Sequence, residues 1–185
     1  MYPFMLKTSS VSILENSLIK LRALEKSDID ILYRIENDTS NWLISSTLIP
    51  FSKNTLENYL QNAHEDIFTA KQLRLVIIDK LRENKIIGLI DLFDYDPLQC
   101  RAGIGIVILE HERNKGFGFL TIEQIKIYAK QVLHLHQLYA NILSDNISSV
   151  KLFEKCDFKF AGNKKEWVRT PYGSWMDEFM YQCIL

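Results

Sequence analysis

Apolar and polar positions along the chain fall into segments with two different periods. Short apolar runs bounded by turn residues predict strands, and apolar side chains at every third or fourth position predict helices. The predicted strands are 18–22, 74–79, 85–93, 101–109, 137–143, 163–170 and 174–185. The predicted helices are 28–37, 53–68, 119–133 and a short one that begins near Ser148.

Strands and helices alternate in the middle of the chain, and both ends carry hairpin strands. This order predicts an α/β (α+β) fold, a mixed central sheet of about seven strands flanked by helices. The chain has 185 residues, 47% of them hydrophobic, which is enough for one substantial core. Seven glycines and four prolines leave no linker-like stretch. We expect one domain over residues 18–185, preceded by an extension over residues 1–17.

Composition narrows the classes of partner. The net charge of −1 favours neither nucleic acid nor an anionic membrane. No apolar run approaches the roughly 18 residues that suggest a membrane span, and residues 1–17 show no secretion signal. The three cysteines, Cys100, Cys156 and Cys183, are too few and too far apart for a disulfide framework or a zinc cluster. We expect a cytoplasmic protein without a bound metal.

A basic turn with two glycines, residues 113–118 (RNKGFG), connects the predicted strand 101–109 to the predicted helix 119–133. The N–H groups of a first helical turn have no intrahelical partner, and the helix dipole adds positive charge there. Glycine lets a bulky anion approach the backbone, while Arg113 and Lys115 add charge. The turn therefore predicts a site for a pyrophosphate.

Other phosphate-binding motifs fit less well. The Walker pattern needs a lysine directly after its second glycine, whereas Lys115 precedes Gly116. A dinucleotide fingerprint needs three glycines at the strand-to-helix turn, whereas Gly103 and Gly105 lie inside the strand. Residues 113–118 alone also leave room for a simple solvated turn.

A second segment strengthens the pyrophosphate interpretation. After the strand 137–143, Asp145 or Asn146 can cap a short helix whose apolar side chains turn inward. The stretch from Asn146 to Phe158 resembles the N-x-x-S-x-x-[LI]-[YF]-x-x-x-G-F signature of the Gcn5-related N-acetyltransferase (GNAT) superfamily. Residues 113–118 resemble that family's [QR]-x-x-G-x-[GA] loop. The likeness is nearest to the branch of polyamine and ribosomal-protein N-terminal acetyltransferases.

The resemblance implies a GNAT-like fold and acetyl-coenzyme A (acetyl-CoA) as co-substrate. The turn would bind the pyrophosphate, and a strand that splays from its neighbour would offer backbone groups to the pantetheine arm. Asn146 is a further candidate for that arm, with a helix cap as its alternative role. The residues expected at the cofactor are Ile106, Val107, Ile108, Arg113, Asn114, Lys115, Gly116, Phe117, Gly118, Asn146 and Phe153.

Two catalytic groups of many relatives have no counterpart here. Where those relatives carry a tyrosine that protonates the leaving thiolate, this chain has Phe153. Where polyamine-branch relatives carry a glutamate early in the fourth strand, it has Gly103. A thiol is a tolerable leaving group near neutral pH, so these changes do not abolish the chemistry. A missing general acid typically costs about 10²–10⁴ in rate.

An ammonium group must lose a proton before it attacks a thioester. Asp91 interrupts an apolar strand and is the candidate base, with Glu110 as the alternative. The other acids that could serve are Asp94, Glu112, Glu36 and Asp38. The region after the first helix lines the acceptor site in relatives. The residues expected at the acceptor are Glu36, Asp38, Trp42 and Asp94, with core packing as the alternative for Trp42.

We therefore expect an N-acetyltransferase that moves an acetyl group from acetyl-CoA to a primary amine by direct attack in a ternary complex. The acceptor is either a polyamine such as spermidine or a protein N-terminus, and the partners include neither nucleic acid nor a membrane. Homo-oligomer formation stays open. The alternative function is a weakly catalytic acetyl-CoA-binding sensor or interaction module.

Overall fold

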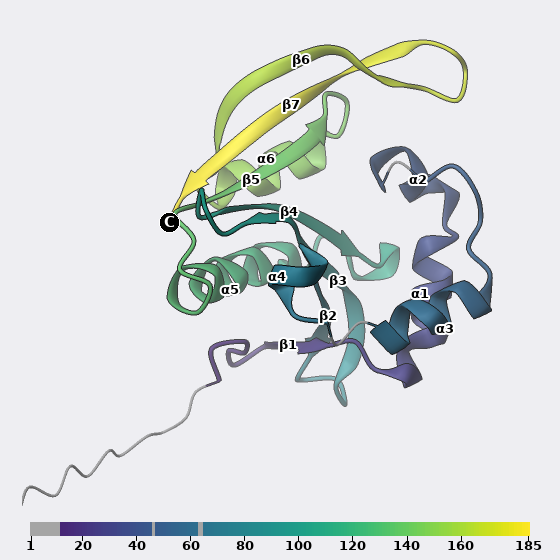
Figure 1. The fold of residues 1–185 in the computed structure, drawn as a ribbon, viewed down its shortest axis with the longest axis vertical. Helices are drawn as coiled ribbons and strands as arrows, with labels where there is room; N and C mark the ends of the chain where they lie inside the picture. The colour runs from purple at the N-terminus through teal and green to yellow at the C-terminus, as the bar shows by residue number, and fades with distance from the viewer. Residues whose placement is uncertain (1–11, 46, 63–64) are drawn as a thin grey trace, which may run out of the picture.

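The computed structural model describes residues 12–45, 47–62 and 65–185, within which seven strands form one sheet (Figure 1). Their order in the sheet is β1-β2-β3-β4-β5-β7-β6. The strands are β1 (Ile19–Ala23), β2 (Leu73–Asp79), β3 (Lys85–Asp96), β4 (Arg101–Ile108), β5 (Gln137–Leu143), β6 (Lys159–Arg169) and β7 (Trp175–Ile184). The predicted mixed α/β sheet of about seven strands is confirmed.

The helices lie between the strands in the chain. They are α1 (Ile29–Glu36), α2 (Thr39–Ser45), α3 (Lys53–Asn62), α4 (Ile67–Ala70), α5 (Phe117–Gln131) and α6 (Ile147–Lys155), with short 3-10 turns η1 (Lys26–Asp28) and η2 (Glu110–Glu112). Strands β4 and β5 are parallel and the other neighbouring pairs are antiparallel. A parallel pair needs a crossover connection, and α5 provides it.

Helices cover both faces of the sheet (Figure 1). On one face the α5 and α6 side chains, among them Ile122 and Phe153, pack against β1 to β5 and β7. On the other face α1 and α3 contribute Leu32 and Leu56 to a second cluster with Leu89 of β3. Alternation of side chains along each strand supplies both layers.

Several elements differ from the predictions, among them β6, which begins at Lys159 and not at residue 163. The predicted helix 53–68 is two helices, because Asp66 caps α4 by accepting hydrogen bonds from the N–H groups of Phe68 and Thr69. Helix α2 was not predicted. Strand β3 continues past residue 93 through a register irregularity, where Asp94 has a φ of 49°.

The two edges of the sheet, β1 and β6, come from the two end regions of the chain. Residues 1–11 of the predicted extension lie outside the described residues, whereas Asn16 donates a hydrogen bond to the Gln124 side chain of α5 at 3.2 Å. Strands β6 and β7 form a long hairpin whose tip reaches out above α2 (Figure 1). Across the part of the chain that is described, no helix has the length and apolar character to cross a membrane.

Candidate active site

Strands β4 and β5 separate partway along their length. Their parallel pairing joins Arg101 to Gln137, Ala102 to Leu138 and Gly103 to Tyr139, and it ends there. Beyond this point β5 stays paired with β7, and β4 stays paired with β3. Residues 104–108 of β4 therefore present one backbone edge that none of the described strands occupies. The predicted splay at Ile106, Val107 and Ile108 is present in the structure.

The turn after β4 leads directly into the N-terminus of α5. Gly116 is the N-cap with a φ of 84°, and Asn114 before it also has a positive φ of 61°. Among the described residues, no group accepts a hydrogen bond from the N–H of Asn114, Lys115 or Gly116. The first helical turn from Phe117 adds further N–H groups without an intrahelical partner.

Space and charge at this turn suit a diphosphate. A Cβ on Gly116 would meet nothing within 4 Å, so an anion can reach the backbone there. Arg113 is exposed and is held at the turn because its Nε donates to the Ile108 carbonyl at 3.0 Å. Gly118 serves a different purpose, since a Cβ there would lie 2.9 Å from Leu152 of α6. Gly118 lies in the first turn of α5, where its close contact is with α6, and its place at the cofactor stays a prediction.

The second signature forms α6 as predicted. The Asn146 side-chain oxygen accepts hydrogen bonds from the Ser149 N–H at 3.2 Å and from Ser148 Oγ at 2.9 Å. Asn146 is therefore a helix cap, and its amide nitrogen has no partner among the described residues. Phe153 is only 4% exposed and contacts Phe158 edge-on. It belongs to the hydrophobic core between α5, α6 and the sheet, which contradicts its predicted contact with the cofactor.

The opposite face of the sheet carries the acidic candidates. Asp91 of β3 and Glu36 of α1 both bind Arg74 of β2, a residue that the sequence analysis did not single out. Arg74 Nε lies 2.6 Å from Asp91 Oδ1, and Arg74 Nη1 lies 2.5 Å from Glu36 Oε1. Burial lowers the pKa of Arg74, but the charge of Asp91, with smaller effects of Tyr59 and Glu36, holds it above its usual value.

The signal that could have revealed this cluster is a pair of opposite charges, one in each of two neighbouring apolar strands. Arg74 of β2 and Asp91 of β3 are direct cross-strand partners. Gln72 Nε2 donates to Asp91 Oδ1 at 3.1 Å, and the Tyr59 ring lies 5.7 Å from the Arg74 guanidinium. The cluster holds one positive and two negative charges, so a net charge of −1 remains.

A pocket of about 370 Å³ opens where β4 and β5 still touch. Tyr139 is in its wall and donates a hydrogen bond to Asp94 Oδ2 at 3.1 Å. Burial and then the charge of Asp94 raise the pKa of Tyr139 to about 12. Within the described residues, Asp94 forms no ion pair, whereas Asp96 is paired with Arg101 at 3.3 Å. The pocket is lined by Asp94, Asp96, Arg101, Gln137, Tyr139, Met180 and Gln182.

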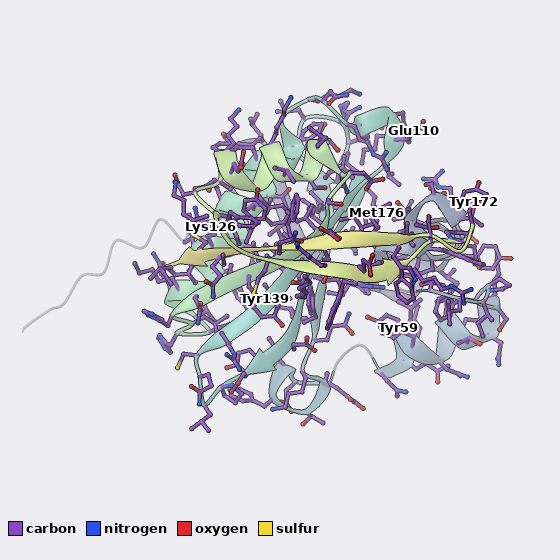
Figure 2. All side chains as sticks on the ribbon, turned by 90° about the horizontal axis from the view of Figure 1, so that it is seen from above. Tyr59, Glu110, Lys126, Tyr139, Tyr172 and Met176 are labelled. Carbon is purple, nitrogen blue, oxygen red and sulfur yellow. The ribbon has the colours of Figure 1, made fainter. Side chains whose placement is uncertain are left out.

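Three further predicted residues, Asp38, Trp42 and Glu110, lie outside the Arg74 cluster and the pocket. Asp38 accepts hydrogen bonds from Ser40, which lower the pKa of Asp38 together with a smaller effect of the Arg113 charge. Trp42 is half-buried, and its Nε1 donates to the Glu36 carbonyl at 2.8 Å. Glu110 is exposed on η2, far from Tyr59 and on the other side of the β6–β7 hairpin (Figure 2).

Comparison with known proteins identifies the family. The model of the acetyltransferase (GNAT) domain matches residues 19–159, which are most of the chain. The chain belongs to the GNAT acetyltransferase family. The family uses acetyl-CoA as its co-substrate, so the protein is an acetyl-CoA-dependent N-acetyltransferase. The separated strands and the open turn at Gly116 fit that cofactor.

Several relatives of this GNAT protein are spermidine acetyltransferases. A spermidine N(1)-acetyltransferase of Vibrio cholerae is 28% identical over 154 residues, covering 82% of this chain and 84% of the relative. The acetyltransferase PseH of Campylobacter jejuni is 26% identical over 80% of this chain and 90% of its own. The crystal structure of a Vibrio cholerae spermidine N-acetyltransferase with CoA and spermine has a TM-score of 0.81, at 25% identity, over 91% of this chain and 96% of that one.

Within this GNAT domain, the structure explains one departure from the family pattern. A Cβ on Gly103 would lie 2.3 Å from the ring of Phe93. The Phe93 side chain therefore occupies the space into which a glutamate at position 103 would extend. The acidic candidates Asp91 and Glu36 lie on β3 and α1 instead.

Proposed function

We propose that this acetyltransferase acts on a primary amine of a polyamine. The observation that carries the proposal is the pocket beside the parting strands, where Asp94 has no cationic partner among the described residues. A carboxylate of this kind binds an ammonium group by charge-assisted hydrogen bonds. The Arg74 cluster on the same face holds a second uncompensated negative charge, and relatives of similar length act on spermidine.

The two acidic positions suit an acceptor with more than one ammonium group. Asp91 lies on the side of the sheet away from α5, since its neighbours Ile90 and Leu92 belong to the core on the α5 side. Asp94 follows at the register irregularity of β3 and accepts a hydrogen bond from Tyr139, whose neighbours Leu138 and Ala140 also belong to that core. One amine of a polyamine would be acetylated while another remains protonated and bound. A simple monoamine can use only one of the two positions.

Direct attack by the amine is the mechanism that the side chains favour. A covalent acetyl-enzyme would need a reactive nucleophile, and burial raises the pKa of Cys156 to about 12 and raises that of Cys183. The half-exposed Cys100 lies in the β3–β4 turn and not on the unpaired edge of residues 104–108. Bound acetyl-CoA supplies the activated acetyl group. Asp91 is the proposed base, since hydrogen bonds from described residues reach only its Oδ1. Glu110 stays the alternative.

Steady-state kinetics with three acceptors test the proposal. Spermidine, butylamine and a decapeptide with a free N-terminus are compared at saturating acetyl-CoA. We expect spermidine to give the highest kcat/KM. Preference for the decapeptide would establish the protein N-terminus as acceptor, and cofactor binding without any product would favour the sensor.

The variant Asp94→Asn links the result to the pocket. It should raise KM for spermidine about two- to fivefold, as expected for a contact between exposed charges, and change KM for butylamine less. Glu83→Gln is the matched control, because Glu83 is exposed and lies in the β2–β3 turn at the other end of β3 from Asp94. Equal effects of both variants would exclude a specific role for Asp94.

A further inference from the structure

A fully buried carboxylate lies beneath the cofactor turn. Glu112, the last residue of η2, is 0% exposed although its neighbours His111 and Arg113 are exposed. Its Oε2 accepts hydrogen bonds from Lys115 Nζ at 3.0 Å and from Arg82 Nη2 at 2.6 Å. Its Oε1 accepts from Lys85 Nζ at 2.8 Å and from Arg82 Nη1 at 3.1 Å.

This arrangement keeps Glu112 charged. The hydrogen bonds from Arg82 and Lys85 hold the pKa of Glu112 well below its usual value, against the effect of burial. The paired Arg82 contact is bidentate, which fixes the direction of the carboxylate. Since both oxygens are held from the β2–β3 turn, Glu112 presents a fixed acceptor to Lys115.

Arg82 lies near both ends of the turn formed by residues 113–118, since it contacts Glu112 before the turn and Phe117 at the start of α5. The Arg82 guanidinium lies 5.7 Å from the Phe117 ring, at the first residue of α5, and also binds Asp79 at 2.5 Å. Arg82, Lys85 and Lys115 carry three positive charges against two negative charges on Asp79 and Glu112, so the cluster keeps a net charge of +1. An anion at the turn therefore meets excess positive charge.

We propose that Glu112 is a positioning residue for cofactor binding and acts through Lys115. A free lysine side chain samples many rotamers and loses that freedom when it binds an anion. Glu112 restricts Lys115 before the cofactor arrives, so less freedom is lost on binding. The inference rests on the acetyl-CoA site and is independent of which amine is the acceptor.

Because Glu112 is negatively charged, the proposal and simple electrostatic attraction predict opposite changes in cofactor affinity when Glu112 is replaced. Replacing Glu112 by glutamine removes one negative charge and so raises the net charge of the cluster by one. Simple electrostatic attraction would then bind the anionic cofactor more tightly. Loss of positioning predicts the opposite result. A weaker affinity of Glu112→Gln for coenzyme A can therefore not come from the change in net charge.

The experiment measures dissociation constants of the full chain for coenzyme A by calorimetry and for pantetheine, which lacks the phosphates, by ligand-observed NMR. Glu112→Gln should bind coenzyme A about tenfold more weakly, a change of about 1.4 kcal/mol, and bind pantetheine unchanged. Glu83→Gln, with the same charge change on the neighbouring turn, should match the unmodified protein. In the Lys115→Ala background, Glu112→Gln should have little further effect.

Three results would overturn the inference. They are equal or tighter binding of coenzyme A by Glu112→Gln, equal weakening for coenzyme A and pantetheine, and a full Glu112→Gln effect without Lys115. If Glu112→Gln does not fold, Glu112→Asp keeps the charge and shortens the reach, and the same comparisons apply to it. Failure of the unmodified protein to bind coenzyme A would instead refute the cofactor site itself.

Discussion

Two glycines in nearly identical backbone conformations allow the cofactor turn to be tested separately from backbone strain. Gly116 has a φ of 84° at the start of α5, and Gly173 has a φ of 85° at the tip of the β6–β7 hairpin. A Cβ at either position would meet nothing within 4 Å. Alanine at each position therefore changes the backbone preference without a steric clash.

The expected loss of stability is the same for Gly116→Ala and Gly173→Ala. Holding an alanine in the left-handed region costs about 1–2 kcal/mol, and reduced freedom of the unfolded chain offsets about 0.4–1 kcal/mol of that. The net loss is about 0.5–1.5 kcal/mol, which lowers the melting temperature by roughly 1–5 °C for a chain of this size. Thermal unfolding followed by circular dichroism measures both variants.

Only Gly116→Ala should weaken cofactor binding. Its added methyl group points into the space over the free N–H groups of the turn, where the diphosphate is expected. Loss of one hydrogen bond to a charged group costs about 1.5–3 kcal/mol, which raises the dissociation constant for coenzyme A roughly 10- to 100-fold. Calorimetric titration should show no change for Gly173→Ala. Unchanged affinity of Gly116→Ala, at a matched loss of stability, would refute the turn as the diphosphate site.

Three further predictions concern the charged clusters and the thiols. Arg74→Gln should lower the free energy of unfolding by about 3–5 kcal/mol, measured by urea denaturation, because Glu36 and Asp91 lose their shared partner; a loss below 1 kcal/mol would contradict the cluster. Folding lowers the pKa of Glu112, so the charged Glu112 stabilises the folded chain above the ordinary glutamate pKa, and this stabilisation is lost as the pH falls below that value. Between pH 7 and pH 3, the free energy of unfolding should therefore fall less for Glu112→Gln than for the unmodified protein. At pH 8 a thiol reagent should modify Cys100 quickly and leave Cys156 and Cys183 unmodified until the chain unfolds, and rapid reaction of all three would contradict their burial.

The local structure of the proposed cofactor turn and of α6 was predictable because its signals are local. The strand before the turn, the glycines and basic residues in it, and the helix after it are contiguous in sequence, and the structure places α5 within two residues of the predicted start. Asn146 caps α6 as the spacing predicted. The cap and the turn each depend on a few neighbouring residues, so tertiary packing had little to add.

The acceptor side was only partly predictable because its contacts join distant strands and helices. Asp91 was recognised as an unusual charge in an apolar strand, but its partner Arg74 is 17 residues away in the chain and Glu36 is 38 residues from Arg74. Glu112 was considered only as one of several candidate bases, and its complete burial was not predicted. A glutamate between exposed neighbours carries no periodic signal of burial, and its cations Arg82 and Lys85 come from a turn about 30 residues earlier.

The two clusters have opposite residual charges at two different places on the sheet. The cluster around Glu112, beyond the C-terminal end of β4, keeps a net charge of +1, and the cluster around Arg74, on the face away from α5, keeps −1. Under the proposed function, the diphosphate of the cofactor is attracted to the first cluster and the polyammonium acceptor to the second. Because each cluster repels the other ligand, the arrangement opposes binding of either ligand in the wrong place. The parting of β4 and β5 after Gly103 then leaves an unpaired strand edge between the two sites, where an acetyl group and an amine can meet.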